Sequence, residues 1–296
     1  MAISDETQRF RRAPWFMYPV ALFVFIFAIC PLLVLLVYSF YTVENFRITP
    51  GFSLKNYHEA LTSGLFISLT IKALVFAVVT CVITLIFAYP TAQFIAWRSG
   101  RWKNLMLMGL LIPLYTGDLI RVYAWRIILG IKGVLNTLLL EVGLIAEPIE
   151  VLLFSNFSVM ISIIYIYLPF MILPIWANIE GLDRSLIEAS NDLGAGTART
   201  FNKIMLPLTS PGVFAGVMLV FIPVTGEYLS QNLLGGTSGV TIMNVITAQF
   251  GASFNWPLGS AMAWLLLVIV AVIVSLFLFT LTRQRWIARG LGGGGA

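Results

Sequence analysis

The sequence predicts an all-α integral membrane protein with six transmembrane helices. Hydrophobic residues make up 59% of its 296 residues and charged residues only 10%, and the mean hydropathy is +0.93. Soluble domains carry about a quarter charged residues, so this composition excludes an ordinary soluble protein. The apolar stretches use most of the chain and leave no room for a separate soluble catalytic domain.

A helix needs roughly 20 apolar residues to cross the hydrocarbon core of a bilayer. Six stretches meet this requirement: 15–41, 68–97, 105–129, 153–177, 210–234 and 259–282. The first is too long, and too clearly part of a series, for a cleaved signal peptide. We therefore expect an N-terminal segment at 1–14, a membrane domain at 15–282 that includes a polar loop at 180–208, and a tail at 283–296.

The basic residues predict the orientation. Twelve of the 18 Lys and Arg residues fall on one side if the N-terminus is cytoplasmic: Arg9, Arg11, Arg12, Arg98, Arg101, Lys103, Arg184, Arg199, Lys203, Arg283, Arg285 and Arg289. Cytoplasmic loops are enriched in such residues. Both termini and the 180–208 loop are thus expected in the cytoplasm, in a multi-pass membrane protein.

The opposite loops contain short amphipathic or glycine-rich pieces at 52–57, within 130–152 and within 235–258. We expect interfacial helices and turns there. Lys72, near the outer start of the second span, should extend its ammonium toward the lipid headgroups. The sequence Gly290–Ala296 predicts a flexible end.

The polar loop is the most informative stretch. Leu182, Leu186, Ala189 and Leu193 are spaced as one face of a short helix. Gly194 and Gly196 then supply a turn, Thr197 is placed to cap a second helix through Met205, and Pro207 should close that helix. A helix–turn–helix with an exposed apolar stripe suits docking into a partner's groove, although an ordinary solvated loop would have similar chemistry.

The spacing within this loop resembles the EAA loop of the membrane subunits of bacterial ABC importers, E-A-A-x3-G-x9-I-x-L-P. The matching positions are Glu188, Ala189, Gly194, Ile204, Leu206 and Pro207, and Ser190 stands in place of the second alanine. The resemblance implies the type I importer fold and a coupling helix held in a cleft of a separate ATPase. Serine is small, so we expect the packing to tolerate it.

The resemblance extends over nearly the whole chain. The stretches 121–125, 133–136, 221–223, 226–227, 234–236 and 255–261 look like the first of the two permease subunits in spermidine/putrescine-type importers. It implies a second homologous permease as partner in a heterodimer, two ATP-binding cassette ATPases that bind ATP and Mg, and a periplasmic or extracellular solute-binding protein. A polyamine is the favoured solute. An amino-acid derivative, an opine or a phosphonate is the alternative.

Polar groups inside spans are costly and usually face a cavity or a partner. Asp118 and Glu227 are the two acids there. Arg121 lies three residues after Asp118 and can pair with it on one helix face, whereas no basic residue lies at helical spacing from Glu227. We therefore take Glu227 as the better pathway candidate, with an interhelical hydrogen bond as the alternative. The remaining pathway candidates are Asp118 and the aromatic residues Tyr115, Tyr228 and Trp264, because aromatic faces bind cations.

Other function classes fit poorly. His58 is the only histidine and no G-x-x-x-x-G-K-[ST] motif occurs, so we expect no metal site, no cofactor in this chain and no catalysis by it. A stand-alone secondary transporter often has inverted repeats, which are not visible here. A membrane enzyme or scaffold lacks clustered nucleophiles. The net charge of +5 reflects topology, not binding to nucleic acid, and membrane lipid is an expected partner.

Overall fold

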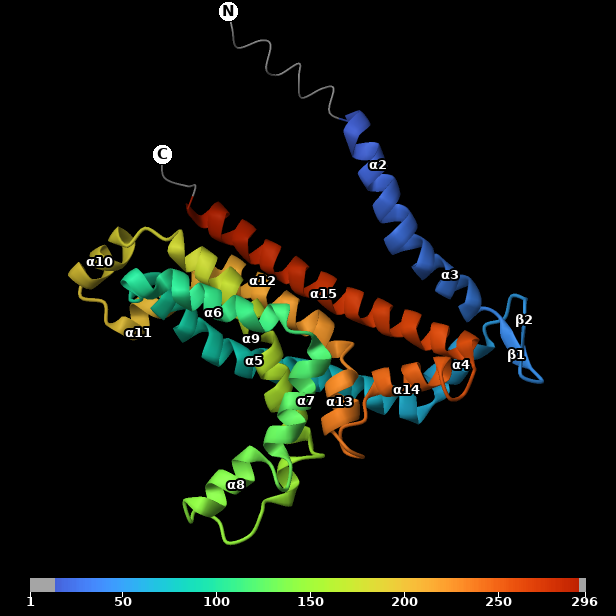
Figure 1. Cartoon of the computed structure of the whole chain (residues 1–296). Helices are drawn as coiled ribbons and strands as arrows, with labels where there is room; N and C mark the ends of the chain where they lie inside the picture. Colours follow the sequence, from blue (N-terminus) through green and yellow to red (C-terminus); the bar gives the residue numbers. More distant parts are fainter. Residues whose placement is uncertain (1–13, 293–296) are drawn as a thin grey trace, which may run out of the picture. The chain divides into compact units, whose positions relative to one another are not determined.

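The computed structural model describes the backbone of residues 14–292 and the side chains of residues 18–279 (Figure 1). The described chain is mostly helical, and its β structure is one antiparallel hairpin. It divides into two compact units. One contains residues 14–66 and 246–273, and the other contains residues 67–245 and 274–292.

The first unit begins with one continuous helical run made of α2 (Pro14–Val24), the π-helical turn η2 (Phe25–Ile29) and α3 (Cys30–Ser39). The hairpin β1 (Thr42–Glu44) and β2 (Arg47–Thr49) and the short helix α4 (Lys55–Thr62) follow. The Asn56 amide attaches α4 to the end of α3 by donating to the carbonyls of Ser39 at 2.9 Å and Tyr41 at 2.8 Å. The amphipathic helix that the sequence predicted at 52–57 corresponds to α4, which begins later than predicted and is longer. The hairpin before it was not predicted.

The second unit contains most of the remaining helices. Their bounds are α5 (Gly64–Trp97, from residue 67), η3 (Gly100–Trp102), α6 (Lys103–Tyr115), α7 (Asp118–Leu129), α8 (Val134–Glu141), η4 (Glu150–Leu152), α9 (Asn156–Glu180), α10 (Ser185–Asp192), α11 (Thr197–Thr200), η5 (Phe201–Met205), α12 (Leu206–Thr225) and α13 (Leu229–Leu234). The helices α14 (Ile242–Phe250) and α15 (Trp256–Gly292) pass from one unit to the other. Because α15 continues to Gly292, residues 290–292 are helical and not the flexible end that we expected. Residues 293–296 and 1–13 lie outside the described part.

The core of the second unit is the packing of α9 against α12. Gly212 and Gly216, one helical turn apart on α12, bring the two backbones together. A Cβ at Gly212 would lie 2.5 Å from the Pro174 carbonyl, and one at Gly216 would lie 2.8 Å from Met171 Sδ. Small residues spaced by four allow such close approach in membranes, where packing drives helix association. The close packing of α9 against α12 therefore fixes the positions of the segments that precede and follow these two helices.

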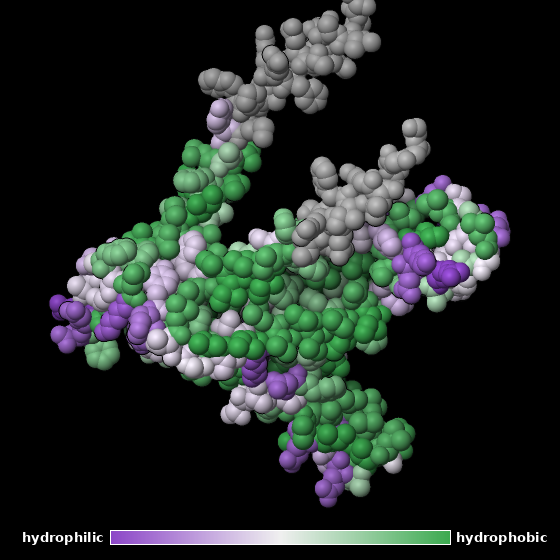
Figure 2. Space-filling view, turned by 180° about the vertical axis from the view of Figure 1, so that it is seen from behind, coloured by the Kyte–Doolittle hydropathy of each residue, from purple (hydrophilic) through white to green (hydrophobic). Residues whose placement is uncertain are grey.

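Within the described residues, six helical stretches are long and apolar enough to cross a membrane: Tyr18–Ser39, Gly64–Trp97, Asp118–Glu141, Asn156–Glu180, Thr197–Thr225 and Trp256–Phe279. Much of the visible surface is apolar, as Figure 2 shows, which agrees with the many large hydrophobic side chains that are exposed. The fold class predicted from the sequence, six membrane helices in an all-α protein, is thus confirmed.

Two of the predicted spans are interrupted. The third, predicted at 105–129, is two helices, because Thr116 and Gly117 adopt extended backbone between α6 and α7. The stretch that is long and apolar enough to span starts later than predicted, at Asp118, and ends at Glu141. The fifth, predicted at 210–234, starts earlier at Thr197 and breaks at Gly226–Tyr228 between α12 and α13. Hydropathy averaged over a whole span does not detect these breaks, because the apolar residues farther along each span outweigh the few polar residues at the break. Non-helical backbone at such depth is tolerated where protein or a cavity surrounds it.

Candidate functional site

The polar loop folds into two helices joined by a sharp turn, as its sequence predicts. Gly194 reverses the chain after α10 with φ at +77°, a left-handed conformation that glycine adopts without strain. Gly196 has an ordinary φ of −68° and is itself the N-cap of α11, so Thr197 is the first helical residue and not the cap that we expected. The turn therefore depends on Gly194 alone.

The helix α10 presents side chains to its surroundings. Leu193 is 88% exposed and Leu186 is 46% exposed, and Glu188 and Ala189 are exposed as well. At its start the Asp183 carboxylate accepts a hydrogen bond from the Ser185 backbone N–H at 3.0 Å. This bond holds the pKa of Asp183 below its usual range, because it stabilises the charged form. Leu186, Ala189 and Leu193 of the expected apolar stripe are thus on the surface, whereas Leu182 precedes α10 and is half-buried.

Ser190 is the one residue of the E-A-S segment that points inward. Its Oγ lies 2.9 Å from Thr200 Oγ1, and both side chains are buried. The hydroxyl that replaces the usual alanine is therefore satisfied across the turn by a threonine on α11. This hydrogen bond joins α10 directly to the helical run that continues into α12.

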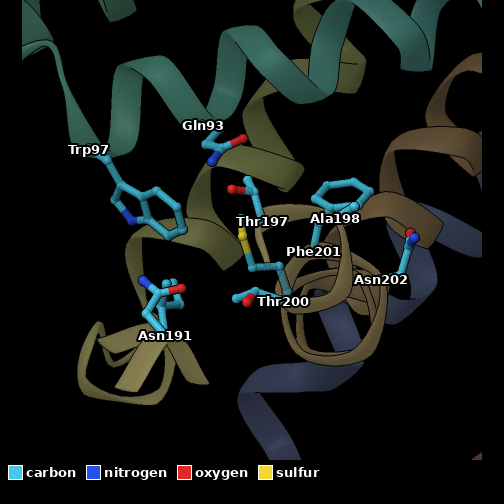
Figure 3. A pocket seen from close by; sticks show the side chains of 10 residues that line it. Gln93, Trp97, Asn191, Thr197, Ala198, Thr200, Phe201 and Asn202 are labelled. Carbon is cyan, nitrogen blue, oxygen red and sulfur yellow. The ribbon is translucent and has the colours of Figure 1, made fainter. Parts of the chain in front are cut away.

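A second attachment connects α10 to the end of α5. The Arg184 guanidinium lies over the Trp97 ring, 6.0 Å from its centroid, and Arg184 Nη2 donates to the Ala96 carbonyl at 3.4 Å. Beside these contacts is a hollow of about 530 Å³, and Figure 3 shows side chains of α5, α10 and α11 around it, among them Trp97, Asn191 and Thr197. The loop thus contacts two long helices, α5 and, through α11 and η5, α12.

Pro207 does not end the second helix of the loop, contrary to the sequence prediction. The π-helix η5 (Phe201–Met205) joins α11 to α12 in one continuous run, and Pro207 is the second residue of α12. Proline disturbs the hydrogen bond to the preceding turn, and the wider π turn directly before it accommodates that disturbance. Ile204 is half-buried within η5, and Leu206 is exposed.

The run is anchored on α5. Tyr89 places its ring edge 5.1 Å from that of Phe201, and its hydroxyl lies 2.9 Å from Thr209 Oγ1. Tyr89 and Thr209 are both buried. These contacts fix the π-helix and the first turns of α12 against the neighbouring span.

Glu227 lies in the break between α12 and α13. Its Oε1 accepts a hydrogen bond from the Ser230 backbone N–H at 2.9 Å, which satisfies an otherwise unpaired donor at the start of α13. Its Oε2 accepts a longer one, at 3.5 Å, from the Tyr167 hydroxyl on α9. The carboxylate is half-buried and therefore remains accessible in the interrupted helix.

Asp118 and Arg121 form the ion pair that their spacing predicts. The two side chains differ in exposure, because Asp118 is 65% exposed and Arg121 only 7%. Arg121 Nε and Nη1 are buried and have no partner within the described residues. The Tyr167 hydroxyl interacts electrostatically with this pair as well as with Glu227. Since α7, α9 and α13 pack against one another, these four residues form one cluster, which we call the α7–α9–α13 cluster.

The other pathway candidates are more dispersed. Tyr228 follows Glu227 and is 41% exposed, and Tyr115 at the end of α6 is 89% exposed. Trp264 belongs to the first unit and is half-buried. Sequence reasoning missed Tyr167 in the cluster. The sequence feature that could have identified Tyr167 is its place in the middle of a predicted span, far from the membrane interface where tyrosine is usually found.

No family model matches the chain, but curated proteins do. The chain is 37% identical over 253 residues to the spermidine/putrescine transport system permease protein PotB of Haemophilus influenzae, and these residues cover 85% of this chain and 87% of that protein. PotB of Escherichia coli is 36% identical with 85% and 91% coverage. The inner membrane ABC transporter permease protein YdcU of Escherichia coli is 32% identical, with 81% and 80% coverage.

Solved structures agree on the fold. A bacterial alginate ABC transporter in complex with an alginate-bound periplasmic protein contains a chain that matches with a TM-score of 0.71 and 16% identity, over 94% of this chain and 96% of that chain. A bacterial ABC transporter involved in alginate import matches with a TM-score of 0.66, 17% identity, and coverage of 95% and 99%. At this identity the likeness concerns the fold alone.

Proposed function

Because the chain belongs to the family of ABC importer permeases that includes the spermidine/putrescine permeases, we propose that it is the first permease subunit of a polyamine importer. It is a multi-pass membrane transport protein and not an enzyme. The polyamine assignment depends on one observation, the acidic α7–α9–α13 cluster in the interrupted helices.

The cluster has the chemistry for a solute ammonium group. Asp118 and Glu227 carry two negative charges and Arg121 one positive charge, so the cluster has a net charge of −1 when all three are ionised. The Tyr167 hydroxyl adds a polar group and its ring an aromatic face, and such faces favour cations. Glu227 sits in non-helical backbone, which membrane proteins use where it lines a cavity. A linear polyamine would bind Glu227 through one ammonium group.

One observation favours a second solute class. Arg121 has two buried nitrogen atoms without partners among the described side chains, and a guanidinium binds carboxylate or phosphonate groups through paired donors. An amino-acid derivative, an opine or a phosphonate would place its anionic group there. Competition between polyamines and these compounds for uptake separates the two classes.

Coupling to ATP hydrolysis is assigned to the loop at 180–208. The residues concerned are Glu188, Ala189, Ser190, Gly194, Ile204, Leu206 and Pro207. The exposed Leu186 and Leu193 supply the apolar contact that an amphipathic helix makes in a partner's groove. Two partner ATPase subunits would bind ATP and Mg themselves and would contact this loop. Both termini and this loop face the cytoplasm, because the basic residues gather on that side.

The remaining partners follow from the same proposal. A second, homologous permease completes the pathway, and a binding protein on the opposite side of the bacterial inner membrane delivers the solute. Movement of α10 would reach the cluster through the two attachments described above, Arg184 to α5 and Ser190 to the run of α12. Glu227 lies directly after that run, so the loop and the cluster are joined by one helix.

Purification from the native membrane tests the assembly. The chain, extracted in a mild detergent, should retain an ATPase with a P-loop motif and a second permease, both identified by mass spectrometry. Reconstituted with these subunits and the binding protein, it should take up labelled putrescine or spermidine when ATP is present. A chain that purifies in good yield alone, or only with copies of itself, would contradict the importer assembly. An intact complex that takes up no polyamine would contradict only the substrate.

A further inference from the structure

A groove on the surface of the second unit has the pattern of an amphiphile site. It has a volume of about 420 Å³ and lies between α5 and the first turns of α9. Ile71, Val75 and Val79 line it at intervals of four residues along α5, and Met160 contributes from α9. Lys72 and Asn156 add polar groups to this apolar lining.

Helix length places Lys72 close to the membrane surface. The 34 residues of α5 span about 51 Å at a rise of 1.5 Å per residue, whereas the hydrocarbon core is about 30 Å thick. A centred helix would extend about 10 Å beyond the core at each end. Lys72 is eight residues, or about 12 Å, from the start of α5, which puts it near the headgroup boundary. The groove residues at 75 and 79 are then inside the hydrocarbon region.

The Lys72 ammonium has an unused donor. It donates to the carbonyls of Ser238 at 2.5 Å and Val240 at 2.7 Å in the loop before α14, and an ammonium carries three N–H groups. The third has no partner within residues 18–279, and the groove lining contains no acid. The groove is therefore a positively charged site at headgroup depth, continuous with an apolar surface below it.

We propose that this groove binds an anionic phospholipid. The phosphate accepts a hydrogen bond from the third Lys72 N–H, and an acyl chain lies along Ile71, Val75 and Val79. The charge of the site favours this occupant. The two carbonyls that bind the Lys72 ammonium are neutral, so they leave its positive charge uncompensated, whereas a phosphate neutralises it. In the orientation proposed above, the site is in the outer leaflet. The lipid site itself does not depend on the transported solute or on coupling.

The test measures lipids that remain bound to the purified importer complex. The complex is equilibrated in detergent with equal amounts of phosphatidylglycerol and phosphatidylcholine and analysed by native mass spectrometry. Wild type should retain phosphatidylglycerol in preference. Lys72→Gln keeps two N–H groups for the loop carbonyls but loses the charge and the third donor. It should retain about fivefold less phosphatidylglycerol, since one cation near a bilayer surface contributes about that factor to anionic lipid binding.

Further variants keep the result interpretable. Lys72→Arg preserves the charge and should retain the lipid, and Lys132→Gln makes the same charge change in an exposed loop outside the groove and should have no effect. Val75→Trp fills the apolar part and should reduce retention with Lys72 intact. A photo-crosslinking residue at position 79 should label lipid. Equal retention of the two lipids by wild type, unchanged retention in Lys72→Gln, or a crosslink from position 79 to the second permease would overturn the proposal.

Discussion

The buried hydrogen bond between Ser190 and Thr200 should act as a unit, and a double-mutant cycle measures this. Thr200→Val removes one hydroxyl and leaves Ser190 Oγ buried without a partner, because the bond of 2.9 Å is its contact across the turn. An unsatisfied buried hydroxyl costs about 1–3 kcal/mol. We therefore expect Thr200→Val to destabilise the loop by about 2 kcal/mol.

The other two corners of the cycle differ in cost. Ser190→Ala leaves the Thr200 hydroxyl, which sits in a helix and can turn to the carbonyl one turn earlier, so its cost should be about 0.5–1.5 kcal/mol. The double variant replaces both partners by apolar groups of similar shape, which is nearly neutral. Because the double variant is nearly neutral while the single variants cost about 2 and about 1 kcal/mol, the expected coupling energy is about 3 kcal/mol, well above the few tenths seen between independent sites.

Two assays read the cycle. Thermal unfolding of the purified importer complex in lipid nanodiscs reports stability, and solute uptake per ATP hydrolysed reports coupling. Uptake per ATP should fall in Thr200→Val and recover in the double variant. Thr197→Val, which removes an exposed hydroxyl on the same short helix, is the matched control and should behave as wild type. If the effects of the two single variants simply add in the double variant, the hydrogen bond does not join the helices as we argue.

Other predictions concern the cluster, the helix packing and the turn. Glu227→Gln should lower polyamine uptake at least tenfold with the complex still assembled. Tyr167→Phe should lower uptake less, because the hydrogen bond from Tyr167 to Glu227 is long at 3.5 Å. Unchanged uptake in Glu227→Gln together with loss of uptake in Asp118→Asn would show that we chose the wrong acid. Gly216→Val should destabilise the protein by about 1–3 kcal/mol by overpacking, since its Cβ would meet Met171. Gly109→Ala, inside α6 with open space around it, should be no less stable than wild type, because alanine is the better helix former. Gly194→Ala should lower the stability of the protein by about 1–2 kcal/mol, because alanine is strained in a left-handed backbone, and it should weaken coupling. Gly196→Ala, where φ is −68°, should change neither stability nor coupling. Equal effects of the two variants would contradict the role of the turn. Glu188→Arg should leave the chain inserted but uncouple uptake from ATP hydrolysis, and normal uptake in this variant would refute the coupling assignment of α10.

Local properties of the chain were enough to predict the class of the protein and the place of its key loop. Hydropathy and span length are properties of single segments, and a bilayer forces each segment to satisfy its own backbone hydrogen bonds, so six helices could be predicted without tertiary information. The Asp118–Arg121 pair was predictable for the same reason, because residues three apart on a helix are neighbours whatever the rest of the chain does.

Tertiary structure decided which distant groups meet. Tyr167 reaches Glu227 across 60 residues, and Lys72 reaches Ser238 across 166; neither contact follows from any local period. The breaks at Thr116–Gly117 and Gly226–Tyr228 also depended on it, since non-helical backbone inside a span is stable only where neighbouring helices or a cavity surround it. Those neighbours are positioned by close packing, such as that of Gly212 and Gly216 against α9. Packing of this kind is a property of two surfaces together, so one sequence read segment by segment does not contain it.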